Sequence, residues 1–397
     1  LVIDRGVADA ALAPVIAAET LADAARAAAV VVARPTAQPR QFRALSQVAV
    51  LAPRARSLAS PSTRLAFLNT AAPLAYETKP WSGEGHDVGL YQAYALGRIA
   101  FPQVQPHPSP LVESGPMASV APPAPTYRPV LPPTVRGEGR ISDAQTETVV
   151  HAGEAHGAHL PGWWTLDEAQ LTLGAEDRPG AFRLRRGFFL GDGTGCGKGR
   201  QIAAVIADNM AQGRVRAVWL SRNDALLEDA RRDWAAIGGG PADIVPLSAW
   251  KQGEAIRLDK GVLFTTYATL RQPARGDRPS RLDQIAAWLG DDFDGVIAFD
   301  EAHAMANAAG GGKGAGGPKK ASLQGMAGLA LQNRLPDARV LYVSATGATT
   351  AENLAYAARL GLWGGPDAPF PTRADFLDAM DKGGVAAMEL VARELKA

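Results

Sequence analysis

The stretch FFLGDGTGCGKGRQIA, from Phe188 to Ala203, decides the fold of this 397-residue chain. Three apolar residues predict a buried strand, five alternating glycines from Gly191 to Gly199 predict a tight loop, and the apolar spacing from Ile202 predicts a helix that ends at Gly213. A glycine-rich loop between a strand and a helix can point its backbone N–H groups at phosphate oxygens, and the helix N-terminus adds its dipole. We therefore predict a phosphate loop.

Lys198 is predicted to reach the β- and γ-phosphates of a bound nucleotide. Two residues depart from the usual pattern: Asp192 replaces its first glycine, and Gly199 replaces the Ser or Thr whose hydroxyl ligates Mg²⁺. We expect a water to fill that coordination position, with weaker metal binding or slower turnover. Read alone, the loop could equally be a glycine-rich turn without a ligand. The residues predicted to bind the nucleotide are Gly193, Thr194, Gly195, Cys196, Gly197, Lys198, Gly199 and Arg200.

A pair of acids follows a second apolar strand, in VIAFDEAH from Val296 to His303. Metal-assisted phosphoryl hydrolysis needs such a pair: Asp300 is predicted to hold Mg²⁺ through water, and Glu301 to orient and deprotonate the attacking water. Asp-Glu after a strand is often only a solvated turn. Its place downstream of the loop, in an alternating series of strands and helices, favours the catalytic interpretation, in which ATP and Mg²⁺ are the cofactors.

Two further motifs complete the predicted site. The strand Val340–Val343 leads into Ser344, Ala345 and Thr346, which we predict to couple the nucleotide site to a second lobe through His303. Gln145, in the sequence ISDAQ, is predicted to contact the adenine edge. For Tyr267, at the end of another strand, contact with nucleic acid and packing in the core remain equal alternatives.

The order of elements predicts the fold class. Strands and helices alternate, which is typical of an α/β fold with a parallel sheet flanked by helices, whose ligands bind at the carboxyl ends of the strands. The predicted strands are Phe188–Leu190, Val215–Leu220, Val262–Tyr267, Val296–Phe299 and Val340–Val343, and the later helices are Ala225–Ile237, Leu323–Leu335 and Ala351–Leu360.

The first third of the chain has a different texture. Eleven prolines lie between Pro102 and Pro133, which favours extended chain. Upstream, Leu1–Arg5 is predicted as a strand and Val88–Leu96 as a short helix. We divide the chain into residues 1–34 as the tail of a preceding domain, 35–135 as an irregular, proline-rich connecting segment packed on the lobe, and 136–397 as the lobe itself. Because it starts with Leu1, we expect a fragment of a longer protein.

Composition excludes several classes of protein. The 41 basic and 40 acidic residues give a net charge of +1, so any basic groove must be local. One cysteine, Cys196, excludes an internal disulfide and fits a reducing compartment. The sequence contains no run of about 18 apolar residues, so no membrane span is expected. We therefore expect a cytoplasmic protein. His151, His156 and His159 are poorly spaced for a metal site.

Several segments are similar to one known family. They are HPSPLVESGPMASVAPPAPTYRP from His107, ISDAQTETVVHAGEAH from Ile141, FFLGDGTGCGKGRQIA from Phe188, WLSRNDALLEDARRDW from Trp219, DEAH, and VSATGATTAENLAYAARLGLWG from Val343. They make the chain resemble the strawberry notch family in its bacterial methylase/helicase form, a superfamily 2 helicase-like P-loop NTPase. In that family GKGR, as at Gly197–Arg200, is usual.

The resemblance implies a RecA-like lobe that uses ATP to remodel nucleic acid, DNA more than RNA, or nucleoprotein. It implies a methyltransferase-like domain before this chain and a second lobe, with its arginine finger, after it. The isolated lobe is then expected to hydrolyse ATP weakly. The alternative is a nucleotide-dependent interaction module that regulates transcription without unwinding. A different P-loop NTPase, such as a kinase, is disfavoured by the Ser344–Thr346 motif.

Overall fold

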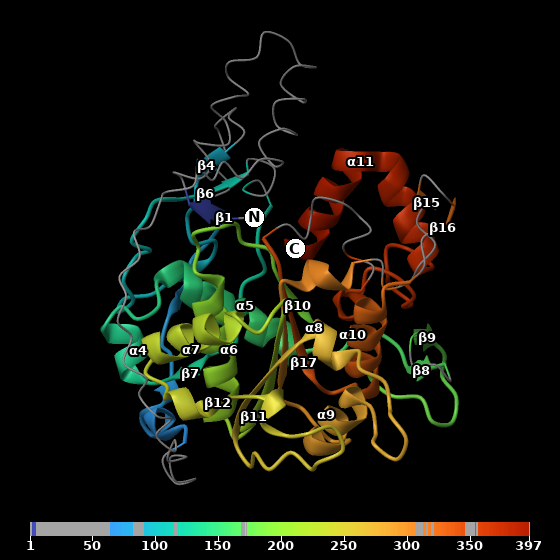
Figure 1. Cartoon of the computed structure of the whole chain (residues 1–397). Helices are drawn as coiled ribbons and strands as arrows, with labels where there is room; N and C mark the ends of the chain where they lie inside the picture. The colour runs from blue at the N-terminus through green and yellow to red at the C-terminus, as the bar shows by residue number, and fades with distance from the viewer. Residues whose placement is uncertain are drawn as a thin grey trace, which may run out of the picture.

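A six-stranded parallel sheet forms the centre of the computed structural model (Figure 1). The structure describes residues 2–4, 64–81, 91–114, 118, 120–167, 171, 173–306, 308, 313–314, 317–318, 321–345, 354 and 356–396. All neighbouring strands of the sheet run parallel, which confirms the predicted α/β fold. In spatial order they are β10 (Phe188–Leu190), β17 (Arg339–Val343), β14 (Val296–Asp300), β11 (Arg216–Ser221), β13 (Gly261–Thr266) and β12 (Ile244–Pro246).

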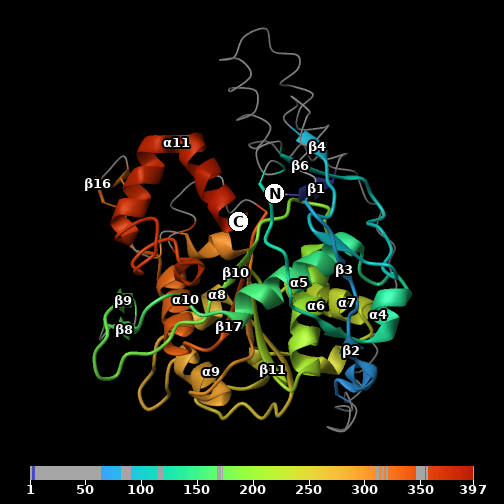
Figure 2. The same cartoon turned by 180° about the vertical axis from the view of Figure 1, so that it is seen from behind.

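Helices cover both faces of this sheet, because its strands are apolar on both sides. In β11, Ala217 and Trp219 face one hydrophobic cluster, while Val218 and Leu220 face the other. The two sets of helices lie on opposite sides of the strands in both views (Figures 1 and 2). One set is α5 (Asp143–Gly157), α6 (Lys198–Ala211) and α7 (Leu226–Ala236), and the other is α8 (Tyr267–Leu270), α9 (Arg281–Leu289) and α10 (Leu323–Arg334).

Most predicted elements agree with the structure to within one or two residues, and two do not. The predicted helix Val88–Leu96 is wrong where it is described: Tyr91–Ala93 is a strand, β4, because it pairs with β6 (Leu111–Ser114). This tertiary pairing overrides the local pattern. Of the predicted helix Ala351–Leu360, the described part contains the 3₁₀ helix Ala358–Leu360, and residues 351–353 and 355 lie outside the described residues.

Short antiparallel strands make up the described N-terminal part. β1 (Val2–Asp4) pairs with β6, β2 (Ala72–Pro73) with β7 (Val130–Leu131), and β3 (Glu77–Thr78) with β5 (Ile99–Ala100). Residues 5–63 lie outside the described part, so the division at residues 34 and 135 stays a prediction. The remaining elements are α4 (Pro133–Gly137), β8 (Trp164–Leu166), β9 (Leu173–Ala175), β15 (Lys313–Gly314), β16 (Gly317–Pro318), α11 (Arg373–Lys396) and the 3₁₀ helices at Ala66–Thr70, Pro241–Asp243, Leu247–Ala249 and Ala302–Met305.

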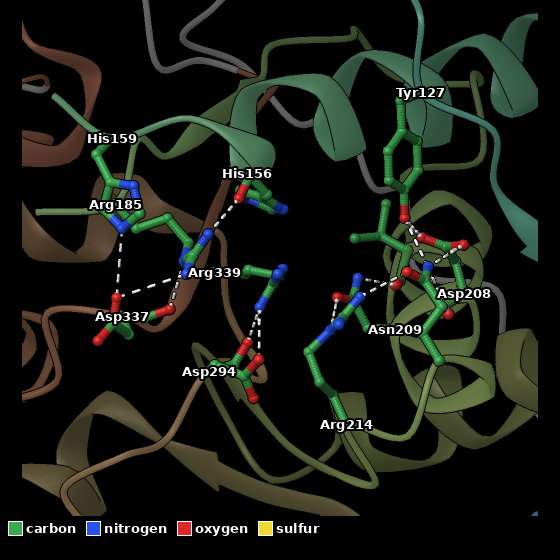
Figure 3. A network of polar contacts seen from close by, with 12 residues as sticks. Tyr127, His156, His159, Arg185, Asp208, Asn209, Arg214, Asp294, Asp337 and Arg339 are labelled. Carbon is green, nitrogen blue, oxygen red and sulfur yellow. Dashed lines mark hydrogen bonds and ion pairs between the residues drawn. The ribbon is translucent and has the colours of Figure 1, made fainter.

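The proline-rich strap, residues 120–133, is bonded to the helices below it. Glu154 of α5 accepts hydrogen bonds from the backbone N–H groups of Thr126 at 2.8 Å and Tyr127 at 2.7 Å. Asp208 of α6 accepts from the Tyr127 hydroxyl at 2.6 Å and from Val130 N at 2.5 Å (Figure 3). The extended backbone, rich in residues that lack an N–H, thus obtains partners from two helices.

Among the helices of the described residues, none has the length and apolarity that crossing a membrane requires.

Candidate nucleotide site

The phosphate loop, Gly191–Gly197, joins the end of β10 to the start of α6. Gly195 has φ 98° and Gly197 has φ 72°, and both values lie in the region that favours glycine. A Cβ on Gly197 would stand 2.4 Å from the Gln145 side-chain nitrogen. Glycine is therefore needed at Gly197 for both conformation and space.

Lys198, the first residue of α6, folds back over this loop. Its Nζ donates a hydrogen bond to the Gly193 carbonyl oxygen at 2.9 Å. The amine lies beside the loop backbone, as the predicted contact with phosphate oxygens requires.

Gln145 lies against the loop from α5. Its Oε1 accepts from Ser142 N at 2.9 Å, which completes a capping box, and its Nε2 donates to the Cys196 carbonyl oxygen at 2.9 Å. Both polar ends of the side chain therefore bond to the protein. The arrangement holds the loop in place, and the predicted contact of Gln145 with adenine stays a prediction.

A second glutamine explains the unusual Asp192. Gln201 Nε2 donates to Asp192 Oδ2 at 3.1 Å and to the Cys196 carbonyl oxygen at 3.2 Å, and its Oε1 accepts from Thr148 Oγ1 at 2.5 Å. Burial raises the pKa of Asp192, while this hydrogen bond and the charge of Lys198 act in the opposite direction. Sequence reasoning missed Gln201. The feature that could have identified Gln201 is its amide side chain, which directly precedes the apolar face of the helix that begins at Ile202.

The predicted acids lie on the same edge of the sheet as the loop. In the strand register Leu190 is level with Val343, and Val343 is level with Asp300. Only β17 separates β10 from β14, so the loop and Asp300 start about 10 Å apart, two strand spacings. Glu301 follows with φ 50°, a left-handed conformation that turns the chain sharply at the strand end.

Asp300 is a partly buried acid that accepts few hydrogen bonds. Its Oδ2 accepts from Ser221 Oγ at 2.9 Å, and its Oδ1 accepts from Glu301 N at 3.0 Å. Burial, with a smaller contribution from the charge of Glu301, raises the pKa of Asp300 to about 6 against the effect of Ser221 and the nearby Trp219 indole. A divalent cation would offset the desolvation of this carboxylate. Ser221, at the end of β11, was missed in the sequence.

The alternatives for Tyr267 are resolved in favour of the core. Its side chain is 1% exposed, its ring stacks on Phe299 at 6.4 Å, and its hydroxyl donates to the Asp300 backbone carbonyl oxygen at 2.7 Å. Tyr267 therefore fixes the strand end that carries the acids.

The predicted coupling residues form a connected path. His303 Nδ1 lies 3.2 Å from Glu301 Oε2 and 3.2 Å from Ser344 Oγ, and Ser344 N donates to the Leu190 carbonyl oxygen at 3.1 Å. The acids are thus linked to the strand that precedes the phosphate loop. Ala345 follows Ser344, and Thr346 lies outside the described residues.

The space around Gly199 explains why glycine, and not Ser or Thr, occupies this position. A Cβ built on it would stand 2.0 Å from Asp233 Oδ2 and 2.8 Å from Asp233 Cγ. The carboxylate of α7 therefore occupies the space that a Ser or Thr side chain takes in the usual loop. Burial raises the pKa of Asp233, and the charges of Arg232 and Arg200 oppose the rise.

The site suits Mg²⁺ bound together with phosphates. Asp300 and the Ser221 hydroxyl would hold it, directly or through water, and Glu301 lies next in the chain. Within the described residues there is no group of three or more His, Cys, Asp or Glu arranged to hold a metal. Mg²⁺ bound through one or two carboxylates, substrate phosphates and water does not need such a group. His156 and His159 instead bond to Val340 O and to Asp337.

Comparisons with known proteins agree with this geometry. A family model described as "P-loop containing NTP hydrolase pore-1" matches residues 106–397. Strawberry notch homolog 1 of Gallus gallus is 38% identical over 297 residues, 73% of this chain and 22% of that protein. FORGETTER 1 of Arabidopsis thaliana is 37% identical over 299 residues, 74% of this chain and 21% of that protein. The chain thus spans about a fifth of the length of these relatives.

Among solved structures, the Sulfolobus solfataricus SWI2/SNF2 ATPase core in complex with dsDNA is similar at a TM-score of 0.36 and 18% identity, over 53% of this chain and 38% of that chain. The predicted resemblance to strawberry notch proteins is confirmed by the sequence relatives. Its bacterial methylase/helicase form stays a prediction.

Proposed function

Because the chain belongs to the family of P-loop containing NTP hydrolases described as pore-1, we propose that it is the ATP-binding and ATP-hydrolysing lobe of a helicase-like DNA translocase. ATP hydrolysis in this lobe drives the remodelling of nucleic acid or nucleoprotein by the longer protein. Cytoplasmic location belongs to the same proposal.

The residues divide the chemistry between them. The loop backbone and Lys198 bind and orient the β- and γ-phosphates. Glu301 accepts a proton from the water whose oxygen attacks the γ-phosphorus, while the bond to the β–γ bridging oxygen breaks. Asp300 and Ser221 would hold Mg²⁺, directly or through water, and the ion would neutralise charge on the phosphates. His303 orients the Glu301 carboxylate, and Ser344 orients His303.

One observation carries the proposal. Leu190, Val343 and Asp300 are level across three adjacent strands. Contacts from Glu301 to His303 and from His303 to Ser344 connect the ends of β14 and β17. A glycine-rich turn without a ligand needs no such connection to a pair of acids on another strand. The connection supports a site in which the state of the phosphates reaches the strand end at Ser344.

The proposed track is nucleic acid, with DNA favoured over RNA. The order of the helicase-type motifs along the chain, each at the carboxyl end of a strand, supports a nucleic-acid track, and the preference for DNA follows from the resemblance to the strawberry notch family. The net charge of +1 supports a local rather than a global basic surface. A second lobe in the longer protein is expected to complete the hydrolytic site, so the isolated lobe binds ATP and turns it over slowly.

The test is ATP hydrolysis by the longer protein, measured with and without single-stranded DNA, double-stranded DNA and RNA. We expect stimulation by DNA. Lys198→Ala is expected to abolish both basal and stimulated hydrolysis, and Lys382→Ala, on an exposed part of α11, is the matched lysine control. Hydrolysis that depends on Lys198 but responds to no nucleic acid would favour the alternative, a nucleotide-dependent interaction module that regulates transcription without unwinding.

A further inference from the structure

A buried amide contacts the phosphate loop near both of its ends. Gln201, in α6, is 1% exposed, and its Nε2 donates to Asp192 Oδ2 at 3.1 Å and to the Cys196 carbonyl oxygen at 3.2 Å. Its Oε1 accepts from Thr148 Oγ1 of α5 at 2.5 Å. Since a carboxylate and a carbonyl oxygen can only accept, the nitrogen end of the amide must face the loop.

The Cys196 carbonyl oxygen receives a second amide from another helix. Gln145 Nε2 of α5 donates to it at 2.9 Å. The two donors match the two lone pairs of this oxygen, so its direction is set from both α5 and α6. Because a trans peptide bond is planar, the Gly197 N–H points away from the two amides. Among the described residues this N–H has no acceptor, and a backbone N–H of this kind attracts a phosphate oxygen.

A second buried glutamine has the same chemistry away from the loop. Gln284 of α9 is 5% exposed, and its Nε2 donates to the backbone carbonyl oxygens of Lys251 at 2.9 Å and Glu254 at 2.6 Å. These bonds hold an exposed segment and satisfy the buried amide. Gln201 differs in its partners, which are an acid of the phosphate loop and the carbonyl group that precedes Gly197, where φ is 72°.

We propose that Gln201 is a positioning residue for the phosphate loop. Through Cys196 it fixes the peptide that presents the Gly197 N–H to the phosphates, and through Asp192 it ties this peptide to the start of the loop. The loop is thus ordered before the nucleotide arrives, which lowers the cost of ordering it on binding. The inference rests on the proposed function and deepens it, because it identifies what pre-orders the phosphate site. Gln201 acts through the loop and takes no part in hydrolysis.

The variant Gln201→Glu removes only the donor. It keeps the shape of the side chain and an acceptor for Thr148, but at about pH 8 it sets a carboxylate against Asp192 and the Cys196 carbonyl oxygen. Its affinities for ATP and for inorganic tripolyphosphate, both in Mg²⁺, are expected to fall about 10-fold or more. Both ligands should lose affinity by the same factor, because the loop contacts only the phosphates. Calorimetric titration of the full chain measures both.

Acid should rescue this variant, which a merely structural role does not predict. The charged groups around the new carboxyl are Asp192 and the two that act on it, Lys198 and Glu147. Burial and the two acids favour protonation of the new carboxyl, and Lys198 opposes it. A protonated carboxyl has the shape of the amide and one O–H donor. At about pH 5.5 the loss, relative to wild type at the same pH, should therefore shrink to about 3-fold or less.

Two further variants complete the design. Gln201→Met loses donor and acceptor alike, and it should bind both ligands about 10-fold more weakly at either pH. Gln284→Glu is the matched control: it should lose stability in urea, while the folded protein binds both ligands as wild type does. If Gln201→Glu does not fold, Gln201→Met decides between the two roles.

The outcomes separate this inference from the proposed function. If Lys198→Ala abolishes tripolyphosphate binding but Gln201→Met binds as wild type does, only this inference is overturned. The same holds if the loss in Gln201→Glu is equal at the two pH values. If wild type binds neither ATP nor tripolyphosphate, the proposed function is overturned as well.

Discussion

Asp300, which is partly buried, and Asp208, which is buried, lie toward opposite ends of the strands, and burial raises the pKa of each to about 6. Asp208 receives three hydrogen bonds, from the Tyr127 hydroxyl, Val130 N and the Gln212 amide at 2.9 Å. Among the described residues, Asp300 receives two, from Ser221 Oγ and Glu301 N. The protein itself supplies three donors to Asp208, which holds the strap, whereas Asp300 keeps more capacity for a ligand.

The surroundings of the two acids extend this contrast. Near the amino ends of the strands, basic side chains pair with carboxylates. Arg185 and His159 lie beside Asp337, and Arg339 lies beside Asp294 (Figure 3). At the carboxyl ends, burial raises the pKa of Asp192 and Asp233 as well as that of Asp300. At the amino ends of the strands, charged groups are thus paired within the protein. At the carboxyl ends, acids gather where a metal and a triphosphate are proposed to bind.

The largest expected difference between the edges is in catalysis. Glu301→Gln should lower ATP hydrolysis by about 100-fold or more, because the amide cannot accept the proton of the attacking water, while ATP binding is retained. Asp294→Asn, at the amino edge, should leave hydrolysis at the wild-type level. Single-turnover hydrolysis and equilibrium ATP binding measure the two effects. An active Glu301→Gln protein would remove Glu301 from the role of base.

The chemistry of the carboxyl edge could be predicted because it is written in short local patterns. Each motif can be recognised from a few consecutive residues: the strand Phe188–Leu190, the glycines after it, and the acids at Asp300 and Glu301. The parallel sheet then follows from the alternation of strands and helices, since parallel strands need crossover helices.

The supporting contacts could not be predicted, because they join residues far apart in the sequence. Nothing near Ser221 indicates that its hydroxyl bonds to Asp300, and nothing near Asp233 indicates that it takes the space beside Gly199. The strand Tyr91–Ala93 was missed for the same reason, since its hydrogen-bond partners lie in β6. Patterns along the chain identify the functional residues at the end of a strand. The residues that surround them are known only from the packing of the folded protein.

Asp208 gives the next prediction. Because the pKa of Asp208 is about 6 in the folded protein, above the ordinary 3.8, its contribution to stability is fully present below pH 3.8 and is lost as the pH rises through 6. The stability of wild type relative to Asp208→Asn should therefore fall by about 3 kcal/mol between pH 3.5 and 7. Urea unfolding across this range measures it. Parallel stability curves for the two proteins would show that Asp208 does not titrate as the structure implies.

His156 predicts the opposite dependence at the same edge. Its ring is buried, its Nε2 bonds to Val340 O at 3.0 Å, and burial lowers its pKa to about 3. The unfolded chain binds a proton below pH 6.5 that the folded protein does not, so stability is lost as the pH falls from 6.5 toward 3. His156→Gln, which keeps a donor, should lose about 2 kcal/mol less than wild type between pH 7 and pH 5. An equal loss in both proteins would contradict the neutral, buried ring.

The smallest expected effect sharpens the contrast at the carboxyl edge. Gly199→Thr restores the residue of the usual phosphate loop, but its Cβ would stand 2.0 Å from Asp233 Oδ2. Since the clash is with the end of a half-buried side chain that can turn away, the loss of stability should be about 1 kcal/mol. In the Asp233→Ala background the same substitution should cost nothing, and a double-mutant cycle measured by urea unfolding isolates the coupling. Additive effects would mean that Asp233 does not require the glycine, and the absence of a hydroxyl beside Lys198 would then need a reason other than space.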